Sequence, residues 1–445
     1  MKSIYKLFVL ILAAVSLTGC DVEEYPNLNS PDLDNLLEDP TLGDIQDLVG
    51  GMQAGMRNNI GGYLDNCGVI GREYYRFATS DPRFTSDLLG KGTAVLDNNT
   101  FYITNPWAAR YRVVKNALIV LEAVDITKSD ITEEEKNGIR GFANTIRAYE
   151  LLLNLNLTYQ NGIRIETSDP DNLGPVVGYE ESLNTIQEIL ASAATELDAA
   201  GDDFAFVPST GFEGLIPEGG DHLSPADFIK FNKAIAARVA AYRGDMPAVS
   251  ALLGDSFLDV NGDLQAGAYY VFSADGNDVF NPMFFAQNSP ASNARIAHPT
   301  FLEDAEAGDE RLSKVTEREE SLTLDNLTGD YDFFVYTSNV SSIPIIRNEE
   351  LVLLYAEANY EANPAEAINA INVVRNAAGL PDYSGGMGAA ELLDEILMQR
   401  RYSLYGEGHR WIDMRRYNRL GELPTDRAED DVWEQFPIPL NENVE

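Results

Sequence analysis

The chain has 445 residues, and 71 acidic side chains against 32 basic ones give it a formal net charge of -39. This length allows one to three domains with a large buried core, and a hydrophobic fraction of 44% excludes a disordered acidic polymer. The charge excludes a nucleic-acid binder, because phosphate contacts need a basic surface. It also disfavours direct binding to anionic lipid surfaces.

The first twenty residues have the layout of a secretory signal. Lys2 and Lys6 precede an apolar run from Leu7 to Leu17, which is too short for a membrane-spanning helix of about 20 residues. The run ends in Leu-Thr-Gly-Cys20, which resembles a bacterial lipobox. The resemblance implies a signal peptide at residues 1–19, cleavage before Cys20 and lipidation of Cys20. The alternative is an ordinary signal peptide with an incidental cysteine.

Residues 20–40 are rich in Pro, Asn and Asp and are predicted to form an acidic tether. Directly after Cys20, the acidic stretch 21–24 resembles the surface-export signal of Bacteroidota lipoproteins, whereas in enterobacteria an Asp at this place implies inner-membrane retention. If Cys20 carries lipid, Cys67 has no disulfide partner in the chain, and we interpret it as a small packed apolar residue.

Helical periodicity dominates the rest of the chain. Apolar residues recur at three- and four-residue spacing over 111–124, and Thr132 with Glu135 forms a capping box for the next helix. Ser182 is predicted to open another helix, and Ser224 with Pro225 to cap a third. The predicted helix pairs lie near 111–156, 182–254 and 349–405. Their scale matches tetratricopeptide-type packing and predicts a mostly α scaffold in a single domain, 41–445.

Two segments, 45–110 and 255–345, are turn-rich and are expected to carry the functional loops on this helical frame. Within the second, Asp259-x-Asn261-x-Asp263 resembles the start of a calcium loop. It has Leu264 where such a loop needs Gly and Tyr270 where it needs Glu, so an Asn-Gly turn is favoured.

Catalytic and metal-binding patterns are missing from the sequence. The three histidines are far apart, no zinc-type spacing or Gly-x-Ser-x-Gly elbow occurs, and so many carboxylates make any glycosidase pair meaningless. We expect no metal, no cofactor and no enzymatic activity. The one basic concentration comprises Arg400, Arg401, Arg410, Arg415, Arg416 and Arg419. It predicts either a phosphate or acidic-sugar site or, as we favour, ion pairs with Glu395, Glu407 and Asp413 across packed helices.

Three stretches together resemble the SusD/RagB family of outer-membrane nutrient-binding lipoproteins. They are IPIIRNEELVLLYAEA (343–358), AEAINAINVVRNAAGL (365–380) and QRRYSLYGEGHRWIDMRR (399–416), of which the last is the most specific. The resemblance implies a SusD-like scaffold of tetratricopeptide-like helix pairs with a loop-rich ligand-binding region. It also assigns the arginine cluster to the fold core.

The same resemblance implies a non-catalytic, surface-exposed lipoprotein of the cell outer membrane that functions in polysaccharide utilization and nutrient uptake. It would capture a glycan and deliver it to a SusC-like TonB-dependent transporter; which glycan is left open. The alternatives are a RagB-like subunit that takes up peptides and, less favoured, a surface glycosidase. Sugars present apolar faces to aromatic rings and hydroxyls to polar side chains. The candidate ligand-binding residues are Trp107, Tyr74, Tyr75, Asp81, Arg83, Phe284 and Phe285.

Overall fold

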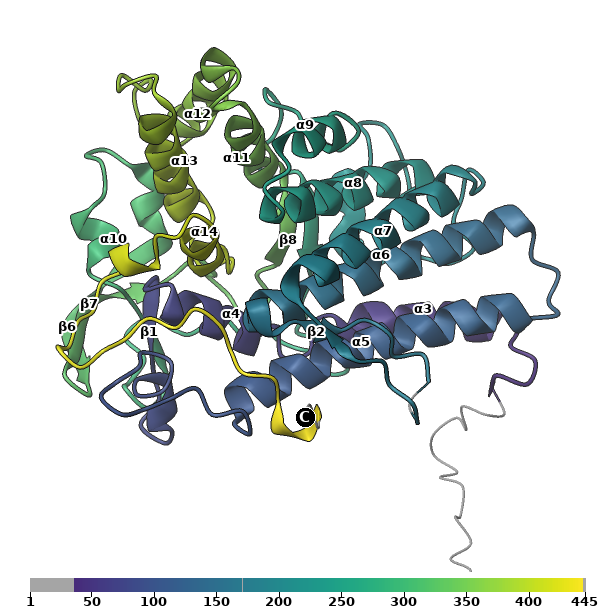
Figure 1. The fold of residues 1–445 in the computed structure, drawn as a ribbon, viewed down its shortest axis with the longest axis horizontal. Coiled ribbons are helices and arrows are strands. Elements are labelled where there is room, and N and C mark those ends of the chain that lie inside the picture. Colours follow the sequence, from purple (N-terminus) through teal and green to yellow (C-terminus); the bar gives the residue numbers. More distant parts are fainter. Residues whose placement is uncertain (1–35, 170, 443–445) are drawn as a thin grey trace, which may run out of the picture.

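The computed structural model describes residues 36–442 except Pro170 (Figure 1). The predicted signal peptide, Cys20 and most of the predicted tether lie outside the described residues. Among the described helices, none is both long enough and apolar enough to cross a membrane.

A row of antiparallel helices forms the frame of the molecule, and each helix packs on the next one in the row (Figure 1). The helices are α5 (Phe101–Ile126), α6 (Glu133–Thr158), α7 (Tyr179–Asp198), α8 (Pro225–Tyr242), α9 (Met246–Gly254), α11 (Asn348–Asn359), α12 (Pro364–Ala377) and α13 (Ala389–Ser403). This arrangement confirms the predicted mostly α scaffold of helix pairs.

Local sequence signals place several of these helices where they were expected. The Thr132 hydroxyl accepts a hydrogen bond from the Glu135 amide while the Glu135 carboxylate accepts one from the Thr132 amide, which is the predicted capping box of α6. Ser224 caps α8, with Pro225 at its first position. Helix α7 begins three residues before the expected Ser182, at Tyr179, because Gly178 serves as its N-cap.

Helix α5 begins ten residues before the periodic segment that predicted it. It includes Pro106, which removes a backbone donor from the helix interior. The carbonyl of Tyr102, four residues earlier, would lose its partner, but the side-chain amide of Asn66 donates to it at 2.5 Å. Trp107 therefore lies inside a continuous helix.

The two turn-rich segments contain more regular structure than their composition indicates. Residues 45–110 include most of α3 (Leu42–Gly55) and all of α4 (Ile60–Ile70). A four-stranded sheet has the order β1 (Tyr74–Phe77), β5 (Ala294–Ala297), β7 (Leu327–Phe333) and β6 (Val315–Leu324), with antiparallel neighbours. Two small ladders are β2 (Ile163–Arg164) with β3 (Val176–Val177), and β4 (Gly267–Tyr270) with β8 (Ile343–Arg347). Several of these strands have four residues or fewer, too few for alternation to be recognised.

Short elements and an extended C-terminal segment complete the described part of the chain. The short elements are α10 (Thr300–Glu303), α14 (Arg410–Arg416) and the 3-10 helices η1 (Pro82–Phe84), η2 (Tyr159–Asn161), η3 (Thr210–Leu215), η4 (Glu310–Lys314), η5 (Leu420–Glu422) and η6 (Leu440–Glu442). The segment after η5, which we call the C-terminal strap (423–442), runs from the sheet side back to α5 (Figure 1). Backbone amides of Asp431, Phe436 and Leu440 tie it to Leu89, Leu157 and Asn98.

Candidate ligand-binding face

Three of the predicted ligand-binding aromatics are buried in the core. Tyr74, Tyr75 and Trp107 are 0%, 2% and 2% exposed. The Tyr74 hydroxyl donates to the carbonyl of Leu64, and the Trp107 indole donates to Glu442 in the C-terminal strap. Their rings therefore present no face to solvent on which a sugar could stack.

The remaining predicted residues lie at or near one surface beside β1 and η1. Asp81 and Arg83 belong to the turn of η1, whereas Phe285 is half-buried in the loop before β5. Phe284 is also half-buried and packs against the main core. The structure thus brings Arg83 and Phe285, which are about 200 residues apart in sequence, to the same surface.

A continuous series of aromatic and guanidinium contacts defines this surface. Arg83 lies 4.8 Å from the ring centroid of Phe101, whose ring contacts that of Phe84 at 5.1 Å. The Arg76 guanidinium lies 5.1 Å from Phe84 and 4.8 Å from Phe285. We call these five residues the Arg–Phe face. Arg83 is exposed and the other four are half-buried, so edges of the face reach solvent.

Two carboxylates hold the arginines of the face in place. Asp81 forms a bidentate pair with Arg83, at 2.8 and 2.6 Å, and this hydrogen bonding lowers the pKa of Asp81. Asp65 pairs with Arg295 at 2.7 Å and lies 3.5 Å from Arg76. The single carboxylate of Asp65 thus contacts two guanidiniums. Arg76, Arg295 and Asp65 together carry a net charge of +1 at this end of the face.

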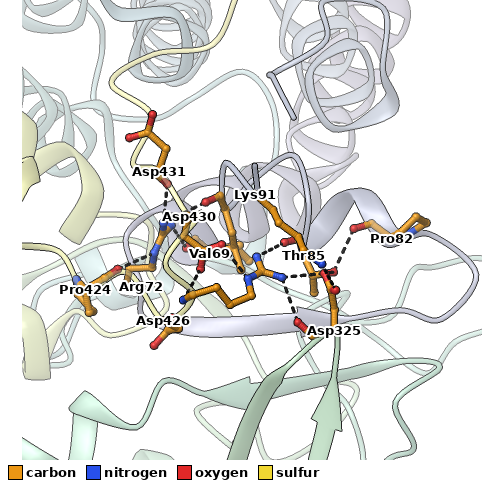
Figure 2. Close-up of polar contacts among 12 residues, drawn as sticks. Val69, Arg72, Pro82, Thr85, Lys91, Asp325, Pro424, Asp426, Asp430 and Asp431 are labelled. Atoms are coloured by element: carbon orange, nitrogen blue, oxygen red, sulfur yellow. Dashed lines mark hydrogen bonds and ion pairs between the residues drawn. The ribbon is translucent and has the colours of Figure 1, made fainter. Parts of the chain in front are cut away.

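A polar network behind the face fixes the loop that carries η1 (Figure 2). Arg427 of the C-terminal strap donates to the carbonyl of Thr85 at 2.6 Å and to the Asp325 carboxylate at 2.7 Å. Lys91 pairs with the same Asp325, in the turn between β6 and β7. Arg72 donates to the carbonyl of Asp431 at 2.6 Å. The loop, the hairpin turn and the strap are therefore joined by buried and partly buried hydrogen bonds, which preorganise the residues in front of them.

The geometry of the Arg–Phe face suits a neutral or weakly anionic polyhydroxylated ligand. Half-exposed phenyl edges offer apolar contact, while the guanidiniums and the exposed Asn293, which accepts from Arg76 at 2.5 Å, offer polar groups for hydroxyls. Sequence reasoning missed Arg76, Phe84 and Phe101. The sequence signal for Phe84 was its position next to Arg83, but Arg76 and Phe101 join the face only through tertiary contacts.

The arginine cluster near the C-terminus is mostly structural, as expected. Arg400 pairs with Asp413 at 2.7 Å, Arg401 with Asp304 at 2.8 Å, and Arg416 with Glu357. Arg415 donates to backbone carbonyls, and Arg419 pairs with Asp394 at 2.5 Å. Of the three predicted acidic partners, only Asp413 binds the cluster. Glu395 and Glu407 instead pair with Arg375 of α12 and Arg347 of β8.

The calcium-like segment is closed by protein groups. The Asn348 side chain donates to the carbonyls of Asp259 and Asp263, and the Asp259 carboxylate accepts from the Asn261 amide. The Gly262 amide donates to the Asp259 carbonyl, so the segment is a turn, as the sequence favoured. Within residues 36–442, no three or more His, Cys, Asp or Glu side chains are grouped so that they could hold a metal ion.

Known proteins resemble this chain in the sequence of its C-terminal segment and in its fold. Residues 334–442 match the model of the SusD family. The SusD-like protein P38 from Formosa agariphila is 37% identical over 92 residues, which span 19% of this chain and only 18% of that protein. The C-terminal segment therefore matches the SusD family in sequence.

Solved structures extend the similarity in fold over most of the chain. A SusD superfamily protein from Parabacteroides distasonis superposes with a TM-score of 0.66 at 17% identity, covering 90% of this chain and 96% of its own. The surface glycan-binding protein A from Bacteroides uniformis gives a TM-score of 0.66 at 15% identity, covering 90% and 97%. At such identities the matches establish a shared fold, and the ligand is argued from this chain's own residues.

Proposed function

We propose that this protein is a SusD-family, non-catalytic, surface lipoprotein that binds an oligosaccharide or polysaccharide and delivers it to a SusC-like TonB-dependent transporter in the outer membrane. The observation that carries the proposal is the Arg–Phe face, where partly exposed phenyl rings lie in contact with guanidiniums on a preorganised loop surface. This combination of apolar ring contact with hydroxyl-binding groups is what a sugar chain requires.

Further support comes from the relatives and from the N-terminal sequence. The Bacteroides uniformis structure that shares this fold is described as a glycan-binding protein. The lipobox ending in Cys20 supports anchoring, since several acyl chains give stable membrane attachment. The transporter partner rests on the family resemblance alone.

A glycan array followed by calorimetry on the purified chain tests the proposal. A glycan that binds the wild type should bind Phe285→Ala and Arg83→Ala about fivefold more weakly, because each change removes a contact of about 1 kcal/mol. Tyr383→Ala serves as the matched control, since this half-buried aromatic precedes α13 and lies outside the Arg–Phe face. Circular dichroism should show the same helical content in all variants.

Three results would contradict the proposal. Binding of oligopeptides with no response on the glycan array would favour the peptide-uptake alternative. Turnover of a polysaccharide that disappears on substitution of one carboxylate would show an enzyme. If all three variants bound the glycan as tightly as the wild type does, the Arg–Phe face would not be the binding surface.

A further inference from the structure

A pocket of about 550 Å³ lies on a different part of the molecule, between α13, α14 and η5. Helix α13 supplies Leu397, Met398 and Arg401 to its wall, which are three and four residues apart and so share one helix face. Helix α14 supplies Arg410 and Met414 in the same way. The pocket therefore combines an apolar wall with guanidinium groups.

Three arginines line this pocket, and two of them, Arg401 and Arg419, form ion pairs with carboxylates. Arg401 pairs with Asp304 and also donates to the Thr300 hydroxyl, both at 2.8 Å. Arg419 pairs with Asp394 at 2.5 Å and has Glu422 at 3.8 Å. These two side chains have their charge and most of their donors occupied.

Among the six arginines of the C-terminal cluster, Arg410 has, in the part of the chain that the structure describes, neither a carboxylate partner, as Arg400, Arg401, Arg416 and Arg419 have, nor the backbone carbonyl partners of Arg415. Within the described chain, no carboxylate lies within 4.0 Å of its guanidinium, and its buried Nε has no hydrogen-bond partner. The nearby carboxyl of Glu73 does not compensate, since burial raises the pKa of Glu73 to about 8 and keeps it protonated at neutral pH. Burial and the neighbouring Arg401 lower the pKa of Arg410 to about 10, so it still carries its charge at pH 7.

An uncompensated, partly buried guanidinium is costly unless something completes its hydrogen bonds. We propose that this pocket binds an oxyanion, a carboxylate or sulfate on a small organic molecule, with Arg410 as the cation and Leu397, Met398 and Met414 against the carbon skeleton. A guanidinium presents its donors in a fork that matches such an anion in two places. The site does not depend on the proposed glycan function of the Arg–Phe face.

Thermal unfolding and calorimetry of the mature chain test this site with three probes. Sodium glucuronate represents an acidic sugar, sodium propionate a plain carboxylate, and sodium sulfate the bare anion, each against sodium chloride at equal ionic strength. At least one probe should raise the Tm of the wild type above the chloride value, by mass action. Arg410→Gln should weaken its binding at least tenfold, while Arg140→Gln on the exposed side of α6 should not.

A second variant keeps the test decisive if Arg410→Gln fails to fold. Met398 is 37% exposed on α13, so Met398→Glu is compatible with the helix but places a negative charge in the pocket. It should abolish binding of the probe, whereas Glu188→Gln at an exposed position of α7 should leave it unchanged. The inference is overturned if no probe exceeds chloride with the wild type. Binding that survives in whichever of the two pocket variants folds would overturn it as well.

Discussion

The carboxyl of Glu73 is one of the most deeply buried acidic groups of the described chain. It is 2% exposed, and its Oε1 accepts from the Gly406 amide at 3.1 Å while Oε2 has no partner. Burial raises its pKa from about 4.5 to about 8, an effect that the positive charges of Arg410 and Lys314 reduce and Glu407 increases. This residue stabilises the fold only when it is protonated.

The pH dependence of stability follows from this shift. Between about pH 4.5 and 8 the folded chain keeps the Glu73 proton that the unfolded chain releases, so its contribution is complete below pH 4.5 and is lost as the pH rises through 8. Glu73→Gln keeps the acceptor for Gly406. It should match the wild type at pH 5 and exceed its free energy of unfolding by a few kcal/mol, on the order of 1.4 kcal/mol per pKa unit, at pH 9.

Urea denaturation at a series of pH values measures this difference. The exposed Glu188→Gln is the matched control and should follow the wild-type profile. A constant offset between Glu73→Gln and the wild type at all pH values would contradict the assignment.

At the scale of single elements, helix α6 can approach α7 closely because Gly141 has no side chain. A Cβ at this position would lie 2.6 Å from Leu197 Cγ and 2.8 Å from the Ala193 carbonyl oxygen. Gly141→Ala should therefore destabilise the fold by about 1–3 kcal/mol, since the helices must separate. Chemical denaturation measures the loss.

The matched control lies in α3. A Cβ at Gly50 would meet nothing within 4 Å, so Gly50→Ala should be neutral or should stabilise the chain by up to about 1 kcal/mol through helix propensity alone. If both variants lost stability equally, helix packing would not be the reason for Gly141.

A buried ion pair joins α8 to α11, although about 100 residues separate the two helices in sequence. Arg238 binds Glu350 through two hydrogen bonds of 2.7 and 2.6 Å, and both residues are under 5% exposed. Burial by itself would raise the pKa of Glu350, but the charge of Arg238 prevails and lowers it to about 2.

Glu350→Gln leaves the Arg238 guanidinium buried without a counter-charge. It should cost about 3–5 kcal/mol in the free energy of unfolding. By contrast, Arg140→Gln removes a pair with exposed carboxylates and should cost at most about 1 kcal/mol. Thermal and urea unfolding of both variants check the comparison, and a loss below 1 kcal/mol for Glu350→Gln would contradict it.

At the scale of the whole molecule, the C-terminal strap joins parts that are far apart in sequence. Arg427 connects it to the η1 loop and to the hairpin turn at Asp325, and Trp107 in α5 donates a hydrogen bond to Glu442, the last described residue of the strap. The strap therefore holds the loop that presents the Arg–Phe face.

Arg427→Gln should loosen this loop without unfolding the helices. Amide hydrogen exchange over 81–91 and over the β6–β7 turn should become at least several-fold faster, because the variant cannot maintain all the contacts of the guanidinium. Exchange in α6 and α8 should stay at the wild-type rate. Faster exchange throughout the chain would instead show that Arg427 supports global stability.

The sequence by itself determined the helical frame, the caps of α6 and α8 and the structural role of most C-terminal arginines, because periodicity and capping are local properties of the chain. It did not determine the short strands, the early start of α5 across Pro106, or which aromatics are buried. Those features depend on partners distant in sequence, such as Asn66 for the Tyr102 carbonyl and Glu442 for Trp107. The Arg–Phe face and the unpaired Arg410 likewise depend on the tertiary structure. Packing between distant segments determines which side chains are buried and which contacts they make, and these in turn control their exposure and charge.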